Sequence, residues 1–140
     1  MGLRREGREA AVQFLFSKDL HPLEGQPSED ERRAFWEIHN AKKGARQFAE
    51  GLISGVTQHV AEIDERIAST AENFSIERLA GVDRNILRLA IYEFLKTPEV
   101  PRPVVINEAI EIAKKFASAE SAAFVNGILD KISKELSPQS

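Results

Sequence analysis

Three arginines near the start of the chain are the most concentrated group of side chains that could bind a charged ligand. Arg4, Arg5 and Arg8 fall in the first turns of an expected helix, about residues 4 to 20. Positive charge in a first turn opposes the helix dipole, so this cluster calls for a negatively charged counter-ion. Phosphate is the expected one, which makes RNA the candidate ligand. The alternative is ordinary solvated surface charge, since two glutamates interleave with the arginines.

Groups typical of catalysis are scarce in this sequence. The three histidines are isolated, and neither a nucleophile elbow nor a glycine-rich phosphate loop is present. Glu108 and Glu111 have the spacing of metal-binding carboxylates, but such helical bundles also need Glu-x-x-His motifs. We expect Glu111 and Asn107 to brace neighbouring helices instead. The sequence therefore predicts a protein that is not an enzyme, with no catalytic residue, metal or cofactor.

The composition is that of one globular domain, which we expect to span residues 1–140. Hydrophobic residues make up 42% and charged residues 29%, and no cysteine is present. No signal peptide or membrane span is predicted, so a cytoplasmic protein is expected. The net charge of -3 argues against a uniformly basic nucleic-acid-binding surface but allows a local basic patch.

The hydrophobic period is helical nearly everywhere, which predicts an all-α fold. Gly44 is expected to end the second helix, and residues 45–71 are expected to form one long helix. Gly51 and Gly55 in that helix indicate a close crossing by another helix. The helix over 81–96 is apolar on most sides and should be central. The expected elements are helices at about 4–20, 29–43, 45–71, 81–96, 103–117 and 120–136, with a short capped turn at 75–78.

Three parts of the sequence carry a resemblance to a known family. They are RREGREAAVQFLF at the start, VDRNILRLAIYE at residues 82–93, and PVVINEAIEIAKKF followed by FVNGILDK. Together they resemble the NusB family of bacterial transcription antitermination proteins. The resemblance implies about seven helices in two small helical subdomains. It also implies binding to the ribosomal small-subunit protein NusE and to boxA, a single-stranded RNA element, and entry into the RNA polymerase elongation complex with other Nus factors.

The resemblance also implies two sets of site residues. The implied RNA-binding residues are Arg4, Arg5, Arg8, Gln13, Glu120 and Phe124. The implied NusE-binding residues are Asp83, Arg84, Arg88 and Tyr92. Departures from the family pattern at Glu6, Phe16, Ala122 and Ala123 remove basic or polar groups, and Lys114 and Lys115 are expected to restore part of the positive field.

The Asn-Gly pair in FVNGILD lies within the last expected helix, although this pair usually marks a turn. Glycine inside a helix costs about 1 kcal/mol relative to alanine. We expect this cost to be offset because Gly127 lets the last helix approach the first closely. Ser121 and Phe124 would then lie beside the arginines. Asn126 is expected to bond to a neighbouring helix.

Two other functions remain open from the sequence. The same kind of domain also occurs as the RNA-binding module of RNA methyltransferases. Alternatively, the chain is an interaction protein with reduced RNA binding, as its departures from the family pattern suggest. A homodimer of the free protein is also possible.

Overall fold

The computed structural model describes residues 2–19, 25–71, 75–136 and 138, and this part of the chain is helical without any strand. The all-α prediction is confirmed. The elements are α1 (Leu3–Ser17), α2 (Glu29–Ile38), α3 (Lys43–Gln58), α4 (Val60–Thr70), the short 3₁₀ helix η1 (Ile76–Arg78), α5 (Gly81–Lys96), α6 (Arg102–Phe116) and α7 (Ala119–Glu135).

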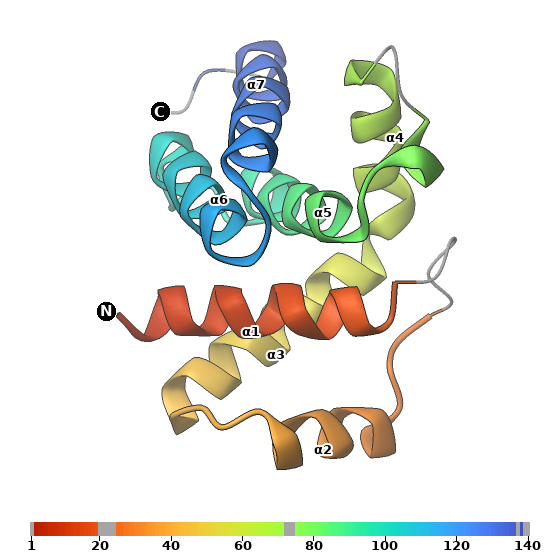
Figure 1. Ribbon diagram of the computed structural model, residues 1–140, viewed down its shortest axis with the longest axis vertical. Coiled ribbons are helices and arrows are strands. Elements are labelled where there is room, and N and C mark those ends of the chain that lie inside the picture. Colours follow the sequence, from red (N-terminus) through yellow and green to blue (C-terminus); the bar gives the residue numbers. More distant parts are fainter. Residues whose placement is uncertain (1, 20–24, 72–74, 137, 139–140) are drawn as a thin grey trace.

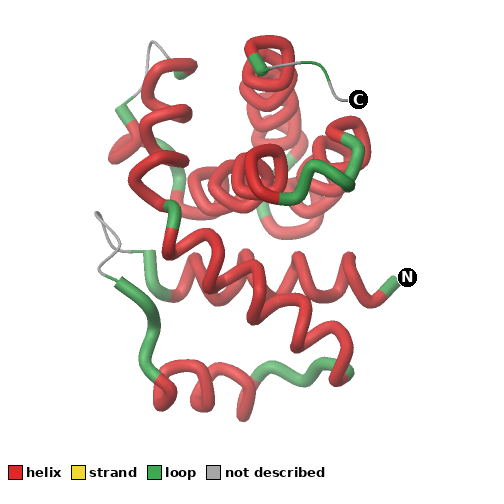
Figure 2. Tube along the Cα trace, turned by 180° about the vertical axis from the view of Figure 1, so that it is seen from behind, coloured by secondary structure: helices red, strands yellow, loops and turns green. Residues whose placement is uncertain are grey.

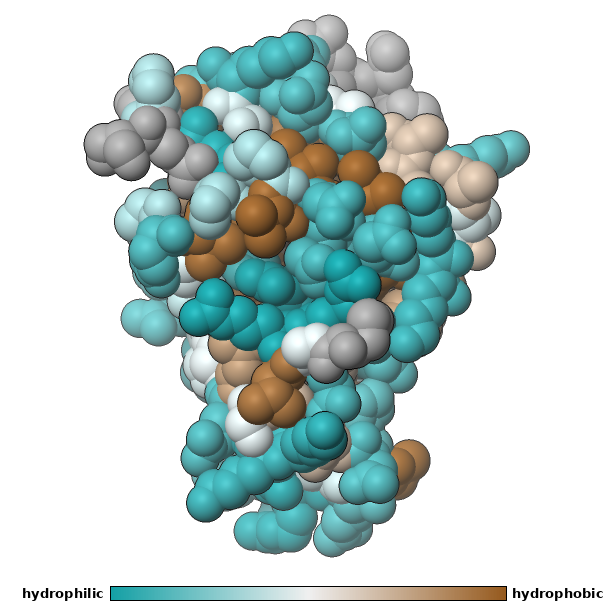
Figure 3. Space-filling view, turned by 90° about the vertical axis from the view of Figure 1, so that its left-hand side faces the viewer, coloured by the Kyte–Doolittle hydropathy of each residue, from teal (hydrophilic) through white to brown (hydrophobic). Residues whose placement is uncertain are grey.

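The helices form two groups that meet along α1 and α5. Helices α1, α2 and α3 form one group, and α4 to α7 form the other (Figure 1). The chain passes between the groups at His59, where a short connection joins α3 to α4 (Figure 2). The two helical subdomains predicted from the family resemblance are therefore present. The face that carries the amino end of α1 is mostly hydrophilic (Figure 3).

Several helix boundaries follow directly from local chemistry. Ser28 begins α2 with a capping box: its Oγ accepts from the Glu31 amide at 3.1 Å, and the Glu31 carboxylate accepts from the Ser28 amide at 3.0 Å. Pro103 lies in the first turn of α6, where its missing N–H has no cost. Ser118 caps α7 by accepting from the Ser121 amide at 3.0 Å.

Two expected boundaries are wrong. Gly44 does not end the second helix, because α2 stops at Ile38 and Gly44 lies inside the first turn of α3. The single helix expected over 45–71 is two helices, interrupted at His59 with φ −111° and ψ 18°. The hydrophobic period continues across His59 because α3 and α4 each bury a face, although they do so in different subdomains.

The close helix crossing predicted from two glycines occurs at one of them. A Cβ on Gly55 would lie 2.2 Å from the ring of Tyr92, so α3 and α5 approach closely only because this residue is glycine. Gly51 has no neighbour within 4 Å of such a Cβ, so the prediction is wrong for Gly51.

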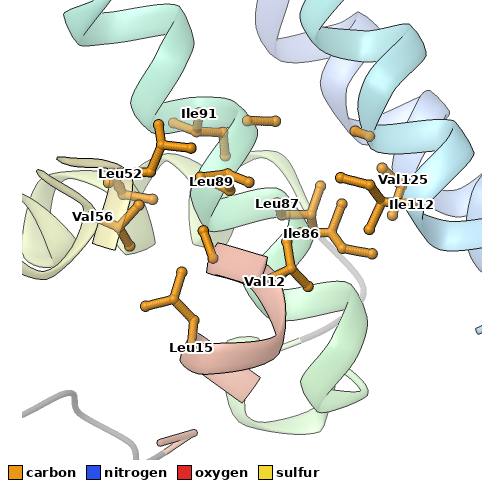
Figure 4. Packing of buried hydrophobic residues seen from close by; sticks show 14 of the residues in the cluster. Val12, Leu15, Leu52, Val56, Ile86, Leu87, Leu89, Ile91, Ile112 and Val125 are labelled. Carbon is orange, nitrogen blue, oxygen red and sulfur yellow. The ribbon is translucent and has the colours of Figure 1, made fainter. Parts of the chain in front are cut away.

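Helix α5 is central, as predicted. Its side chains point toward α1 and α3 on one side and toward α6 and α7 on the other (Figure 4). Leu87 and Ile91 are fully buried, as are Val56 from α3 and Leu129 from α7. Each such side chain contributes about 1.5 to 3 kcal/mol through burial. This shared core fixes the positions of α1, α5 and α6, which carry the charged groups described below.

Candidate nucleic-acid interface

The three arginines at the start of α1 have different environments. Helix α1 lies close against α3 at Gly7, where a Cβ would lie 2.9 Å from the Ala45 carbonyl oxygen. This packing buries Arg8, which is 4% exposed, and leaves Arg5 partly exposed and Arg4 exposed. Availability to a ligand therefore increases toward the amino end of the helix.

Arg8 is held by a carboxylate from the central helix. Its Nε donates to Glu93 Oε2 at 2.9 Å, and its Nη2 donates to Glu93 Oε1 at 2.8 Å. Both side chains are at most 5% exposed, and the guanidinium also lies 5.4 Å from the centre of the Phe48 ring. A buried bidentate pair of this kind is costly to break, because either group alone would be an uncompensated buried charge.

Arg5 pairs with a carboxylate of α6. Its Nε donates to Glu108 Oε1 at 2.9 Å, and Arg8 Nη1 lies 3.9 Å from the same oxygen. The hydrogen bond from Arg5 lowers the pKa of Glu108, against the opposing effect of burial, and the positive charges of Arg5 and Arg8 lower it further. Glu108 thus stays negatively charged and joins α1 to α6.

Arg4 is the most available of the three arginines. Its guanidinium lies 6.0 Å from the centre of the Phe48 ring. Within the described residues it forms no ion pair with a carboxylate. Arg4 is therefore the arginine of this cluster that is best placed to bind a phosphate.

The expectation that all three arginines need phosphate as a counter-ion requires correction. Glu93 and Glu108 supply negative charge to Arg8 and Arg5 from elements about a hundred residues away in the sequence. Arg8 is 4% exposed and is held by Glu93 through two of its nitrogens, so its role is to join α1 to α5. Its predicted contact with RNA remains a prediction that would require this pair to open.

Next to the arginines, α1 and α6 are joined by Glu9. Lys115 Nζ lies 3.0 Å from Glu9 Oε1, while Gln13 uses its amide to donate to the Glu9 carbonyl oxygen at 3.2 Å. Lys114 pairs with Glu111 at 3.5 Å on the same helix. The two lysines expected to restore positive field are thus each matched by a carboxylate.

Helix α7 does not reach the interface in the predicted way. Gly127 has no neighbour within 4 Å of a built Cβ, and Asn126 is exposed without a hydrogen bond to any described helix. Both expectations were wrong because α7 packs against α6 and α5 rather than against α1.

The turn that joins α6 to α7 brings the start of α7 toward α1 (Figure 1). There Glu120 is exposed, and Phe124 is half-buried against the core.

The residues that depart from the family pattern have different roles. Ala122 is 4% exposed and belongs to the core, whereas Ala123 is exposed. Glu6 accepts a hydrogen bond from the Lys42 amide at 3.0 Å and so links α1 to the start of α3. Phe16 is 49% exposed. Glu6 and Ala122 thus serve the fold itself.

Arg84, one of the predicted NusE-binding residues, lies in a polar cluster. Its Nε donates to Asp19 Oδ1 at 3.1 Å, and its Nη1 donates to the carbonyl oxygens of Ile76 and Leu79 at 2.8 Å. Burial raises the pKa of Asp19, but hydrogen bonds from Arg84 and Asn85 outweigh it, so the pKa is lowered. Arg84 thus joins the end of α1 to η1 and α5.

Arg88, one turn further along α5, is fully buried. It donates to both carboxylate oxygens of Asp64 at 2.9 and 3.0 Å and to Asn85 Oδ1 at 3.1 Å. Tyr92 is half-buried over Gly55, and Asp83 has one buried oxygen without a hydrogen-bond partner in the described structure. Of the predicted partner residues, Asp83 and Tyr92 are therefore more accessible than the two arginines.

Four carboxylates that organise these sites were not predicted in that role. Glu93 is the lone acidic residue on the otherwise buried side of an apolar helix, which weakly indicates that it pairs with a buried cation. Glu108 was weighed only as a metal ligand. The pairing of Asp19 and Asp64 with α5 has no local sequence signal. They form their pairs because the tertiary fold brings distant helices together.

The described residues contain neither a cluster of metal-ligating side chains nor a helix suited to span a membrane. Among the described residues, no group of His, Cys, Asp or Glu side chains is arranged to hold a metal ion. In the same residues, no helix is long and apolar enough to cross a membrane.

Sequence comparison relates nearly the whole chain to one family. The model of the NusB family matches residues 5–134. Transcription antitermination protein NusB of Sorangium cellulosum is 42% identical over 97% of this chain and 95% of its own length. The NusB protein of Geobacter sulfurreducens is 46% identical over 97% of both chains.

Solved structures give the same relationship. T. maritima NusB is 40% identical, with a TM-score of 0.81, over 96% of this chain and 93% of its own. A complex of the antitermination factors NusB and NusE with double-stranded RNA contains a chain that is 30% identical, with a TM-score of 0.82, over 96% of this chain and 98% of its own. The sequence motifs, the seven-helix fold and these matches together show that the chain belongs to the NusB family of transcription antitermination proteins.

Proposed function

We propose that this protein acts in transcription antitermination by binding boxA-type RNA together with NusE and joining the elongating RNA polymerase with other Nus factors. Residues 1–140 act as one RNA-binding domain in the cytoplasm, without a catalytic step or a cofactor. Membership of the NusB family supports this proposal, as does the similarity to a NusB chain that was solved with NusE and RNA.

The observation that carries the RNA-binding part is the distribution of charge at the start of α1. Arg4 is exposed without a carboxylate partner in the described structure, and Arg5 is partly exposed beside it. Phe124, near the start of α7, is only half-buried, and an aromatic ring that is partly exposed can stack on a base. Because the net charge is -3, attraction to RNA should be local and weak in the free protein.

The direct test is a titration of labelled boxA RNA with the protein, with and without NusE. We expect tighter binding with NusE and a preference over a scrambled oligonucleotide of the same composition. A duplex that contains the same sequence is a necessary comparison, because the related NusB–NusE complex was solved with double-stranded RNA. Equal affinity for boxA and scrambled RNA, with NusE present, would contradict the proposal.

A second test separates binding from stability in α7. Phe124→Ala should weaken RNA binding about tenfold through lost stacking, with a smaller effect on stability because the ring is only half-buried. Leu129→Ala is the matched control: Leu129 is fully buried, so the free energy of unfolding should fall by about 2 to 5 kcal/mol. If the folded Phe124→Ala protein binds RNA normally, Phe124 belongs to the core alone.

The proposed NusE contact is tested at Asp83, whose side chain is only half-buried and is more accessible than Arg84 and Arg88. Asp83→Asn should weaken binding of NusE, measured by calorimetry, while RNA binding by the free protein stays the same. Asp130→Asn is a suitable control because Asp130 pairs with Lys134 on α7. Equal NusE affinity for the parent and Asp83→Asn proteins would remove Asp83 from this contact.

A further inference from the structure

The start of α3 is unusual for a helix start. Lys42 is at the N-cap position without a side-chain cap, and Lys43 is the first residue of the helix. No acidic residue lies in the first turn, and Arg46 follows one turn later. Ser, Asp or Asn at the cap and acidic residues in the first turn are the stabilising choices, so these cations oppose the helix dipole. Helix stability does not explain them.

These cations also lack carboxylate partners. In the described part of the chain, Lys42, Lys43 and Arg46 are exposed and form no ion pair with a carboxylate, as is true of Arg4. Most other described cations are paired. We call these four residues, Arg4, Lys42, Lys43 and Arg46, the basic edge.

The basic edge is one surface because the starts of α1 and α3 are packed together. A Cβ on Gly44 would lie 2.8 Å from Leu3 Cδ1, and Glu6 accepts from the Lys42 amide at 3.0 Å. Arg4 itself lies over the ring of Phe48 from α3. The amino ends of α1 and α3 lie on the same side of the molecule in both views (Figures 1 and 2).

Two carboxylates beside the basic edge, Glu6 and Glu50, bind other groups. Glu6 uses one oxygen for the Lys42 amide. Glu50 accepts from the Trp36 indole at 2.6 Å and pairs with Arg32. Arg46 lies over the Trp36 ring at 5.3 Å, and it forms no ion pair with a carboxylate of the described residues. Exposed cations without a carboxylate partner attract phosphates. Because the whole protein has a net charge of -3, the basic edge is a local excess of positive charge.

We propose that the basic edge extends the RNA-binding surface from α1 onto the start of α3, where Lys42, Lys43 and Arg46 bind phosphates of the RNA that flanks the recognised element. This proposal rests on the proposed RNA-binding function and adds a second segment of RNA to it. Lysine and arginine that bind phosphate carry no base preference, so flanking RNA of any sequence is the ligand.

The test uses two RNAs and two matched double variants in the presence of NusE. One RNA is boxA alone, and the other is boxA with about ten uridines on each side, a length within the site sizes of single-strand binding surfaces. The test variant is Lys42→Ala with Lys43→Ala. The control is Arg66→Ala with Lys134→Ala, which removes the same charge from α4 and α7, away from this edge.

For the extended RNA, the test variant should flatten the slope of log K against log salt by about 1.4, because it removes two phosphate contacts at about 0.7 each on a single strand. A slope difference of about 1.4 corresponds to about 25-fold weaker binding near 0.1 M salt, relative to 1 M. Binding of boxA alone should change little, and the control variant should bind both RNAs like the parent. Removing Lys42 and Lys43 should not lower stability, because both oppose the helix dipole.

The possible failures are distinct. If the parent protein binds neither RNA, the proposed function fails and this extension fails with it. If the parent binds both RNAs and the test variant binds the extended RNA equally well, only the extension is wrong. Equal loss in the test and control variants would show a general charge effect and would also overturn it. Weaker NusE binding with unchanged RNA binding would assign the edge to a protein contact instead.

Discussion

Two arginine-rich segments, the start of α1 and the middle of α5, show how differently the same side chain is used in one molecule. In α5, Arg84 and Arg88 are almost fully buried and are bound by Asp19 and Asp64. Along α1, the arginines change from buried Arg8 to exposed Arg4 over a single turn. An arginine that is buried against a carboxylate is less available to a ligand than one that is exposed and has no carboxylate partner in the described residues.

The largest effect should come from Arg8→Met. This change leaves Glu93, whose side chain is 3% exposed, without its bidentate partner, and should lower the free energy of unfolding by about 3 to 5 kcal/mol. Urea denaturation measures it. Adding Glu93→Leu should restore most of the stability, because an apolar pair of similar size replaces the ionic one. If Arg8→Met unfolds like the parent protein, Arg8 is not the structural link described above.

Arg88→Met should have a somewhat smaller effect, about 3 kcal/mol, because water can reach the Asp64 side chain, which is 19% exposed. The midpoint of urea denaturation is again the measurement. Arg78→Met is the control: Arg78 is exposed at the nearby η1 turn and should change stability by less than about 0.5 kcal/mol. Similar midpoints for the two variants would mean that the buried network in α5 contributes nothing.

Acid should weaken both regions through their carboxylates. The pKa values of Glu108 and Asp19 lie below their ordinary values of 4.5 and 3.8, so the unfolded chain takes up protons at higher pH than the folded one. Their contribution to stability is therefore complete above the ordinary values and is lost as the pH falls through the lowered ones. Glu108→Gln should be less stable than the parent near pH 7, with a difference that shrinks below about pH 4.5. A difference that stays constant with pH would refute this assignment.

The smallest effect on stability should come from Arg4→Ala, below about 0.5 kcal/mol, because the side chain is exposed and lacks a carboxylate partner in the described residues. Its effect should appear in RNA binding, as a slope of log K against log salt that is flatter by about 0.7. Arg33→Ala is a useful comparison, since Arg33 is exposed but pairs with Asp30 at 3.0 Å. An unchanged slope for Arg4→Ala would remove the difference between the two arginine segments.

The sequence alone determined the elements with local signals. Helix α5 was predicted to the residue and as the central helix, because its apolar residues surround the whole helix axis. The starts of α2 and α6 also carry local signals, because Ser28 and Pro103 each act within one turn of the chain. The motifs in α1, α5, α6 and α7 were specific enough to indicate the family.

Only the tertiary structure decided which charged groups are free. Arg8 pairs with Glu93, 85 residues away in the sequence, and Arg5 pairs with Glu108, 103 residues away. No local sequence pattern predicts ion pairs between residues so far apart. For the same reason, Gly127 was expected to pack closely and does not, whereas Gly55 does against Tyr92. Periodicity specifies which face of a helix is buried, but the neighbour against that face is selected by the packing of the whole core.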